Sequence, residues 1–400
     1  MTQDGDVQHP IVIAGAGIGG LAAALALAQQ GHRIVLMDRA RQLSEVGAGL
    51  QLSPNACSAL DRLGVLDALK PVVCAPDSLR IWSGRSGRQL GRVQLGSFIE
   101  QRHGYPFWVV HRADLQRILL DKVRETPGIT LRLGAEVLDL APSPYEHLVC
   151  IYQDENETGN LHCRALIGAD GVWSKTRKIV PRHQNAHFSG QVAYRATIPI
   201  DKVAPRWTRD SGLWLHSNSH LVHYPVRGDR ELNVVALAEE AWQDETWSAK
   251  ADKEALLHRF KDWPSDVRNL LRLPETWLKW ALCSVDALGP WTHGHVALMG
   301  DAAHAMLPYM AQGAAMAIED AIVLARHLPG DVKNIPAALR AFERSRKPRV
   351  SHIQSIAFRN ARVFHYTGVP ALARDTVLRL SKPARMTARF DGIYSWTADQ

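Results

Sequence analysis

The chain has 400 residues, 46% of them hydrophobic, so it can fill a sizeable core of one or two domains. Its formal charge of +7 favours anionic partners in general, but no zinc-finger, RNP or KH pattern accompanies it, so we expect no nucleic-acid partner. The first apolar segments are too short for a secretory signal or a membrane span, and we therefore expect no membrane span and a cytoplasmic location.

The cysteines and histidines give no disulfide or metal pattern. The five cysteines have no paired or clustered spacing, which is typical of reduced core residues. His293 and His295 form an HxH pair without a third ligand nearby in the sequence. We expect no metal site.

The first structured unit is a βαβ pattern with a glycine-rich turn. We expect a strand over Ile11–Ile13, a turn over Gly15–Gly20, a helix over Leu21–Gln30 and a second strand over Arg33–Asp38. Backbone N–H groups at a helix start can cradle a pyrophosphate where no Cβ intervenes. The pattern predicts a dinucleotide site, and a turn that needs glycine only for tight packing is the alternative.

Within this unit the spacing of polar and small residues is specific. Gly15, Gly17 and Gly20 form a GxGxxG motif, and Asp38 ends the second strand, where a carboxylate can accept hydrogen bonds from ribose hydroxyls. These four residues are candidate cofactor contacts.

Two further strands end at an aspartate. One runs into Gly168 and Asp170, and the other ends at Gly300 and Asp301, with a helix beginning near Gly313. Either aspartate alone would more often cap a turn than bind a ligand. Since ligands of open α/β sheets lie at the carboxyl ends of the strands, we expect the three segments to meet there.

These motifs occur in one order with "EVGAGLQLSPNA" from Glu45, "HRADL" from His111 and "HLVHYPVRG" from His220. Together they resemble the single-component flavoprotein aromatic hydroxylases with the p-hydroxybenzoate hydroxylase fold, and among these the salicylate hydroxylases and 3-hydroxybenzoate 6-hydroxylases. The resemblance extends from residue 11 to about residue 325.

The resemblance implies a tightly bound FAD and NADH or NADPH as a transient co-substrate. Arg112 and Asp301 would contact the FAD pyrophosphate and ribityl chain, and Asp170 would serve both FAD and the pyrophosphate of the nicotinamide cofactor. The backbone at Gln312, Gly313 and Ala314 would face the flavin pyrimidine ring, where a helix N-terminus stabilises negative charge on reduced flavin.

The resulting fold prediction is an α/β protein with an FAD-binding Rossmann-like domain, a discontinuous substrate domain on a mostly antiparallel β-sheet, and C-terminal helices. The apolar, alternating segments between residues 185 and 283 predict that sheet. The expected boundaries are residues 1–70, 101–184 and 284–345 for FAD binding, 71–100 and 185–283 for the substrate, and 346–400 for the C-terminal helices. We leave monomer and homodimer open.

His220 is the leading candidate for a catalytic base. The resemblance places a histidine at this position near the substrate phenol, and imidazole titrates in a range that suits accepting a proton. A histidine that only hydrogen-bonds to a neighbour is the alternative. Strand alternation puts His223 on the opposite face and Tyr224 on the face of His220, where Tyr224 can donate a hydrogen bond to substrate or simply pack.

Pro308 and His304 both follow the third strand end, and we expect different roles for them. Pro308 matches a proline whose carbonyl lies beside the flavin in relatives of the salicylate hydroxylase type, whereas 3-hydroxybenzoate 6-hydroxylases tend to have glutamine there. The following "YMAQGAAMA" favours the second group. His304 belongs to the motif, and we expect it to be structural.

The implied reaction is hydroxylation of a phenolic aromatic acid with O₂ through a flavin C4a-hydroperoxide. A salicylate-type substrate would give catechol and CO₂, and 3-hydroxybenzoate or another aromatic or heteroaromatic phenol remains the alternative. A flavin oxidase or dehydrogenase, or a flavoprotein without catalysis, would use the same cofactor fold.

Overall fold

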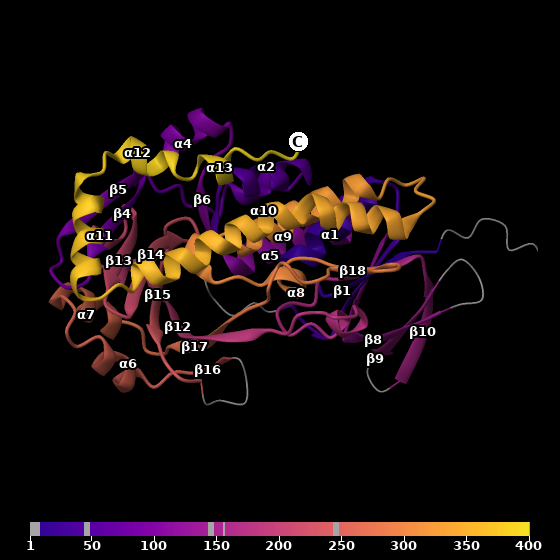
Figure 1. Ribbon diagram of the computed structural model, residues 1–400, viewed down its shortest axis with the longest axis horizontal. Coiled ribbons are helices and arrows are strands. Elements are labelled where there is room, and N and C mark those ends of the chain that lie inside the picture. The colour runs from indigo at the N-terminus through magenta and orange to yellow at the C-terminus, as the bar shows by residue number, and fades with distance from the viewer. Residues whose placement is uncertain (1–8, 44–48, 143–147, 155–156, 243–247, 400) are drawn as a thin grey trace, which may run out of the picture.

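The computed structural model describes residues 9–43, 49–142, 148–154, 157–242 and 248–399, which form two main β-sheets with helices packed around them (Figure 1). Residues 45–48, the first part of the motif that begins at Glu45, lie outside the described residues. The predicted fold class is confirmed, since a Rossmann-like unit, a mostly antiparallel sheet and C-terminal helices are all present.

A six-stranded sheet contains the predicted dinucleotide unit. Its strand order is β18-β19-β11-β1-β2-β7, and every neighbouring pair is parallel except β18 and β19. Its strands are β1 (Ile11–Ala14), β2 (Ile34–Asp38), β7 (Ile129–Leu133), β11 (Ala165–Gly168), β18 (Thr292–His293) and β19 (Val296–Leu298). Because β1, β11 and β19 are adjacent, the three predicted strand ends do meet at one edge.

Helix α1 (Ile18–Gln29) follows β1 through the glycine-rich turn. It begins at Ile18 rather than at the predicted Leu21, so the last two glycines of the turn form its first helical turn. Nearly all of its side chains are buried, because α1 packs against both α5 (Arg112–Glu125) and α9 (Gly313–His327). A helix with small apolar residues on all sides suits such an interior position.

An eight-stranded sheet forms the second layer, in the order β16-β17-β12-β15-β14-β13-β4-β5. It is antiparallel except for the parallel pair of β13 and β4. Its strands are β4 (Ser78–Ser83), β5 (Gln89–Gln94), β12 (His187–Pro199), β13 (Ser211–His216), β14 (Ser219–Val226), β15 (Glu231–Glu239), β16 (Ser248–Lys250) and β17 (Leu278–Ser284). Strands from both predicted substrate segments therefore join one sheet.

Two smaller sheets and a set of short helices complete the first 330 residues. The small sheets are β8 (Ala135–Pro142) with β9 (Leu148–Asp154) and β10 (Glu157–Cys163), and β3 (Gly49–Leu52) with β6 (Trp108–His111). The remaining helices of this part are α2 (Pro54–Arg62), α3 (Leu66–Leu69), α4 (Gly96–His103), α6 (Lys253–Arg259), α7 (Ser265–Arg272) and α8 (Asp301–His304).

The C-terminal helices fold back over both layers. Helix α10 (Ile335–Phe364) has 30 residues and crosses the middle of the molecule in Figure 1, without interruption at residue 345, where we expected a boundary. It is followed by α11 (Gly368–Leu380), α12 (Pro383–Ala388) and α13 (Asp391–Tyr394). Helices α11 and α12 contact β5, so the end of the chain covers the edge of the eight-stranded sheet.

Among the described residues, we find no helix with both the length and the apolar character that crossing a membrane requires.

Candidate active site

A cavity of about 290 Å³, which we call the strand-end cavity, lies where the parallel strand ends face the eight-stranded sheet. The predicted residues that line it are Gly17, Arg112, His220, Tyr224, Asp301, Pro308, Gly313 and Ala314. The predicted residues that do not line it are Gly15, Gly20, Asp38, Asp170 and Gln312. The fold thus brings together eight candidates from six separate segments of the chain.

The absence of a side chain has a different structural reason at each of the three glycines of the GxGxxG motif. Gly15 has a φ of +100°, and a Cβ on it would lie 2.4 Å from the carbonyl oxygen of Ala169. A Cβ on Gly20 would lie 1.8 Å from the carbonyl oxygen of Gly15. A Cβ on Gly17, in contrast, would have no described atom within 4 Å and would point into open space beside the cavity. Gly15 and Gly20 are therefore required by the chain itself, and Gly17 leaves room for a ligand.

Two helix N-termini face the strand-end cavity. Gly17 and Gln312 are the N-cap residues of α1 and α9, and neither helix start has a side-chain cap. The first turns of both helices line the cavity through Ile18 and Gly313. Since the N-terminus of a helix carries partial positive charge and free N–H groups, the cavity offers two places for anionic groups.

Asp38 and Asp170 are held by backbone contacts outside the cavity lining. Asp38 accepts hydrogen bonds from the N–H groups of Ala16 (2.7 Å) and Ala40 (2.8 Å), so it braces the glycine-rich turn. Asp170 accepts from the hydroxyl of Ser174 at 2.5 Å and from the N–H of Thr176 at 3.0 Å. Its carboxylate therefore caps the short turn that follows, which is the alternative role that an isolated aspartate favours.

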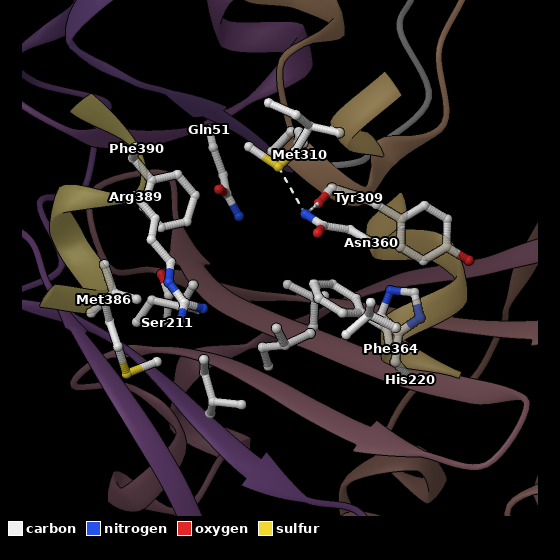
Figure 2. A pocket seen from close by; sticks show the side chains of 18 of the residues that line it. Gln51, Ser211, His220, Tyr309, Met310, Asn360, Phe364, Met386, Arg389 and Phe390 are labelled. Carbon is white, nitrogen blue, oxygen red and sulfur yellow. Dashed lines mark hydrogen bonds between the residues drawn. The ribbon is translucent and has the colours of Figure 1, made fainter. Parts of the chain in front are cut away.

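A second and larger cavity of about 630 Å³ adjoins the first, and we call it the apolar cavity (Figure 2). It lies between the eight-stranded sheet and the C-terminal helices, and most of its lining side chains are aliphatic or aromatic. The two cavities share five lining residues, which are Gln51, His220, Val222, Pro308 and Ala311. These five residues mark the junction of the cavities.

His220 lies at this junction on β14 and is buried, with a relative exposure of 3%. Its Nδ1 is 2.9 Å from Nε2 of His365, and its ring contacts those of Tyr309 and Phe364. Burial, together with His365, lowers the pKa of His220 well below its usual value. At neutral pH the imidazole is therefore neutral, with one nitrogen able to accept a proton.

The neighbouring side chains on β14 follow the predicted alternation. His223 points away from both cavities and packs against Trp207, with ring centroids 4.9 Å apart. Tyr224 lies on the same side as His220 but lines only the strand-end cavity, where its ring fills the space above Gly49. Tyr224 is thus farther than His220 from the apolar cavity.

The segment from Pro308 to Ala311 forms the opposite side of the junction. It is a short 3-10 turn over Pro308–Met310, and Ala311 follows in the left-handed conformation with a φ of 51°. This conformation costs a non-glycine residue about 1 kcal/mol. The turn places Pro308 and Ala311 in both cavities directly before α9 begins.

The residues missed by the sequence motifs come mainly from the C-terminal helices. Arg389 extends into the apolar cavity toward Ser211, and Asn360 donates a hydrogen bond to the carbonyl of Tyr309 at 3.3 Å (Figure 2). The sequence signal for Arg389 is the excess of basic residues near the C-terminus, which equally suits a solvated helix face, and Asn360 has no such signal.

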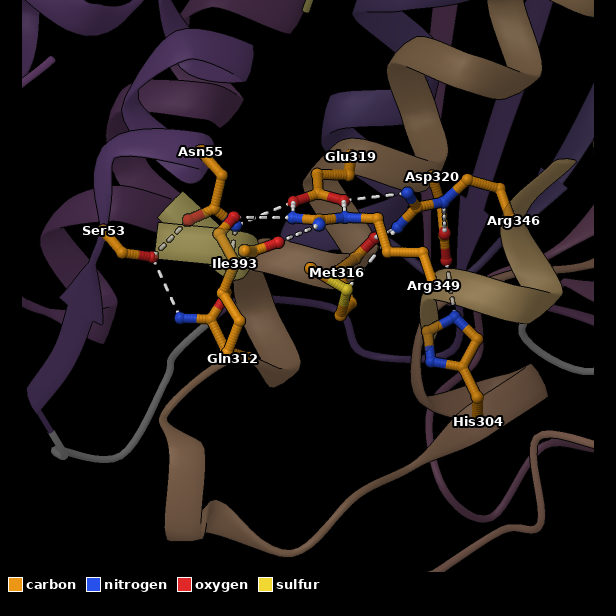
Figure 3. A network of polar contacts seen from close by, with 11 residues as sticks. Ser53, Asn55, His304, Gln312, Met316, Glu319, Asp320, Arg346, Arg349 and Ile393 are labelled. Atoms are coloured by element: carbon orange, nitrogen blue, oxygen red, sulfur yellow. Dashed lines mark hydrogen bonds and ion pairs between the residues drawn. The ribbon is translucent and has the colours of Figure 1, made fainter. Parts of the chain in front are cut away.

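A buried polar network lies behind the strand-end cavity (Figure 3). Glu319 and Asp320 are adjacent on α9 and have no exposed surface. Arg346 of α10 donates to both carboxylates, at 2.8 Å to Glu319 and 2.7 Å to Asp320. Arg349 also donates to Glu319, at 2.7 and 2.8 Å. Both carboxylates are thus paired with guanidinium groups in the protein interior.

The network also holds the loop that carries Asp301. Asp320 accepts from the N–H of Gly300 at 2.9 Å and lies 2.6 Å from Nε2 of His304. Burial raises the pKa of Asp320, but His304 and Arg346 lower it more, and the resulting pKa is about 2. His304 therefore has a structural position, as we expected of it.

On its other side the network fixes the start of α9. Asn55 donates to Glu319 at 2.7 Å and to the side-chain oxygen of Gln312 at 3.0 Å. The amide of Gln312 donates in turn to Ser53 at 2.9 Å. The Gln312 side chain thus positions the start of α9. A ligand near this residue would therefore contact its backbone rather than its side chain.

These features fit an FAD molecule. The open space at Gly17 and the two uncapped helix N-termini suit a pyrophosphate and an electron-rich ring, and Arg112 and Asp301 line the same cavity. The junction connects this cavity with the apolar cavity.

Comparison with known proteins agrees with this geometry. Residues 8–356 match the family described as FAD binding domain. The chain is 35% identical to 3-hydroxybenzoate 6-hydroxylase of Polaromonas naphthalenivorans (strain CJ2), over 98% of this chain and 97% of that protein.

Two solved structures have the same fold. Klebsiella pneumoniae HpxO complexed with FAD and uric acid superimposes with a TM-score of 0.84 at 23% identity, covering 96% of both chains. A salicylate hydroxylase substrate complex superimposes with a TM-score of 0.81 at 24% identity, covering 98% of this chain and 96% of the other.

We predict that Gly17→Val removes most bound FAD from a folded protein. A valine side chain would occupy the open space of the turn, whereas the protein itself offers no clash there. FAD affinity should fall at least about tenfold, a cost of about 1.4 kcal/mol. The ratio of flavin to protein absorbance measures this. Gly392→Val on α13, where a Cβ would also meet open space, is the control. A fully yellow Gly17→Val protein would contradict the placement.

We predict that Arg346→Met lowers the free energy of unfolding by about 3 kcal/mol or more, because it leaves two buried carboxylates short of a partner. Denaturant unfolding at saturating FAD measures the change. Arg344→Met, an exposed position on the same helix, should shift stability by less than about 0.5 kcal/mol. Equal effects of the two substitutions would exclude the network as a stabilising element.

Proposed function

Because the chain belongs to the FAD binding domain family of flavoprotein aromatic monooxygenases, we propose that it hydroxylates a phenolic aromatic acid at the junction of its two cavities. The enzyme uses FAD as its cofactor, with dioxygen and NADH or NADPH as co-substrates. When bound and reduced, FAD activates dioxygen for transfer of one oxygen atom to the ring.

The observation that carries this proposal is the shared wall of the cavities. His220 and Pro308 line both the strand-end cavity, which fits FAD, and the apolar cavity, which fits an aromatic ring. A ring in the apolar cavity can therefore approach the cofactor only past His220 and the Pro308 turn. Such placement of two reactants against each other is a main source of catalytic rate.

His220 acts in this proposal as the base that takes the phenolic proton. A phenol has a pKa near 10 and reacts poorly with an electrophile until it loses its proton. Because Nδ1 faces His365, Nε2 of His220 is the nitrogen available to a substrate hydroxyl. Tyr224, which lines only the strand-end cavity, contributes to positioning the cofactor there.

The apolar cavity excludes water from the reaction. Its walls combine aliphatic side chains of the sheet with Phe364, Phe390 and Tyr394 from the C-terminal helices. Water at the junction would divert activated oxygen to H₂O₂. An apolar wall beside one base therefore favours coupled hydroxylation over wasteful oxidation.

The cofactor roles that we assign follow the lining of the strand-end cavity. Gly17 and the start of α1 hold the pyrophosphate, Arg112 and Asp301 hold the pyrophosphate and ribityl chain, and the backbone of Gly313 and Ala314 faces the flavin. Asp38 offers its remaining lone pairs to the ribose.

The cationic residue Arg389 supports an acidic substrate. Its side chain reaches into a mostly apolar cavity, whose lining also includes Arg359 and Arg374, and a guanidinium group can hold a carboxylate with two parallel hydrogen bonds. Salicylate hydroxylation at the carboxylate-bearing carbon would yield catechol and CO₂, and para hydroxylation of 3-hydroxybenzoate would yield gentisate. The relative from Polaromonas naphthalenivorans favours the second of these.

The apolar cavity is large enough to bind phenols that are bigger than a single substituted ring. A cavity of about 150 Å³ is sufficient to bind benzene, and the apolar cavity is roughly four times as large. A phenolic acid with an apolar substituent or a second ring therefore fits this space as well as a single ring does.

We predict that His220→Asn lowers the rate of ring hydroxylation on the order of 10²-fold, because the substrate keeps its proton. FAD content should remain unchanged, and NADH oxidation should yield H₂O₂ instead of product. Product quantification per NADH oxidised measures this coupling. His223→Asn, on the opposite face of the same strand, is the control. Normal coupling in His220→Asn would remove His220 from the chemistry.

We predict that Arg389→Met raises KM for carboxylate-bearing phenols by about tenfold or more, because a charged hydrogen bond contributes about 1.5–3 kcal/mol. The KM of a neutral phenol should change little. Steady-state kinetics on matched acid and neutral substrates measures the difference, with Arg385→Met on α12 as the control. A similar loss for both substrates would contradict a carboxylate contact.

The decisive experiment for the function is a substrate screen with product identification. The FAD-loaded protein is mixed with salicylate, 3-hydroxybenzoate and larger phenolic acids, and NADH or NADPH oxidation and products are followed. Formation of a hydroxylated product supports the proposal. Oxygen consumption without any ring hydroxylation would instead identify a flavin oxidase.

A further inference from the structure

His220 is one of two adjacent buried histidines that come from distant parts of the chain. His365 is the residue directly after α10, and its Nε2 lies 2.9 Å from Nδ1 of His220. Both side chains are nearly inaccessible, with exposures of 3% and 6%. We propose that His220, His365 and Glu239 form a proton relay from the apolar cavity to solvent. Since it begins at the same base, this relay depends on the proposed function.

The relay reaches the surface through Glu239, the last residue of β15. Oε1 of Glu239 lies 3.6 Å from Nδ1 of His365, and its side chain is 51% exposed. This distance is slightly longer than a hydrogen bond, and a small rotation of the exposed carboxylate or one bridging water closes it. The three groups thus connect a closed cavity with bulk water.

Hydrogen bonding along this row selects the reactive form of His220. If Glu239 accepts the proton on Nδ1 of His365, Nε2 of His365 must accept, and Nδ1 of His220 must donate to it. Nε2 of His220 is then unprotonated. An exposed carboxylate therefore sets the buried imidazole in the tautomer that a base requires, as the acidic member of a catalytic triad does.

Gln191 stabilises the opposite arrangement. Its amide nitrogen lies 3.5 Å from Nδ1 of His365, and its carbonyl accepts a 2.6 Å hydrogen bond from Tyr309. The Gln191 amide can therefore donate to Nδ1 of His365 once that nitrogen has lost its proton. Each of the two proton arrangements has its own partner in the structure.

The transfer balances without a charge remaining on either imidazole, and the substrate is left as the phenolate that the reaction requires. The O–H bond of the phenol breaks as Nε2–H forms on His220, Nδ1–H of His220 breaks as Nε2–H forms on His365, and Nδ1–H of His365 breaks as Glu239 or its bound water takes the proton. After product leaves, exchange with solvent restores the first arrangement. The row therefore moves one proton outward and leaves both imidazoles neutral.

The relay explains how a buried histidine can act as a base although it does not readily hold an extra proton. Burial lowers the pKa of His220 well below its usual value and that of His365 to about 4, so neither ring holds an extra proton readily at neutral pH. Arg374 on α11 adds to the effect by lowering the pKa of His365. The other titratable groups facing the pair are Tyr309 and Glu239.

The first test reads the tautomers without turnover. In FAD-loaded protein labelled with ¹⁵N-histidine, and assigned with His220→Gln and His365→Gln, His220 should carry its proton on Nδ1. Glu239→Leu should shift that proton to Nε2, because Gln191 then orients His365. Glu231→Leu, at the other end of β15, is the control and should leave the tautomer unchanged. An Nε2-protonated His220 in the wild type, or no change in Glu239→Leu, would overturn the relay.

The second test measures hydroxylation against pH. Wild-type coupling should vary little between pH 6.5 and 8.5, whereas His365→Gln and Glu239→Leu should lose about tenfold at pH 7 and recover as pH rises toward the phenol pKa of about 10. A purely structural role would lower coupling equally at every pH and would overturn the relay. If the wild type hydroxylates no phenol, the proposed function fails, while the tautomers still decide whether Glu239 sets the base form of His220.

Discussion

Two adjacent carboxylates in the interior of α9 constrain most of this structure. An unpaired buried charge costs several kcal/mol, so Glu319 and Asp320 need the cations and N–H groups that surround them. Arg346 and Arg349 supply the cations from α10, and Arg349 also donates to the carbonyl of Ile393 on α13. The contacts of Glu319 and Asp320 thus fix the start of α9, the loop of Asp301 and the end of the chain relative to one another.

The proposed base, His220, and the walls of the apolar cavity come from different parts of the fold. His220 lies on a central strand of the eight-stranded sheet, between β13 and β15, whereas most of the opposite wall belongs to helices α10 to α13. The proposed base therefore has a strand on each side. Much of the cavity shape depends on residues of the C-terminal helices, among which Phe364 contacts the His220 ring. Substrate preference can consequently change along the C-terminal helices while the chemistry at the junction stays the same.

The sequence predicted the parts of the site that local motifs define. Gly17, the strand ends and the helix start at Gly313 follow from short-range patterns, because a turn of this geometry needs specific residue types at fixed spacing. The same patterns could not distinguish Gly17 from Gly15 and Gly20, whose side chains are excluded by the backbone of the neighbouring strand and of the turn itself. His365 and Arg389 were not predicted, because they reach the site through packing across more than a hundred residues of sequence.

Helix α10 serves both halves of the site at once. Arg346 of α10 holds α9, whereas Asn360 and Phe364, the last residue of α10, line the apolar cavity about 20–30 Å farther along the same helix. Because one continuous helix joins these positions, its packing at one end constrains the position of the other end. The cavity wall is therefore not a transferable module. A chimaera that exchanges substrate-binding segments with a relative must cross over before α9, so that Glu319 and Asp320 stay together with α10 and the rest of the C-terminal part.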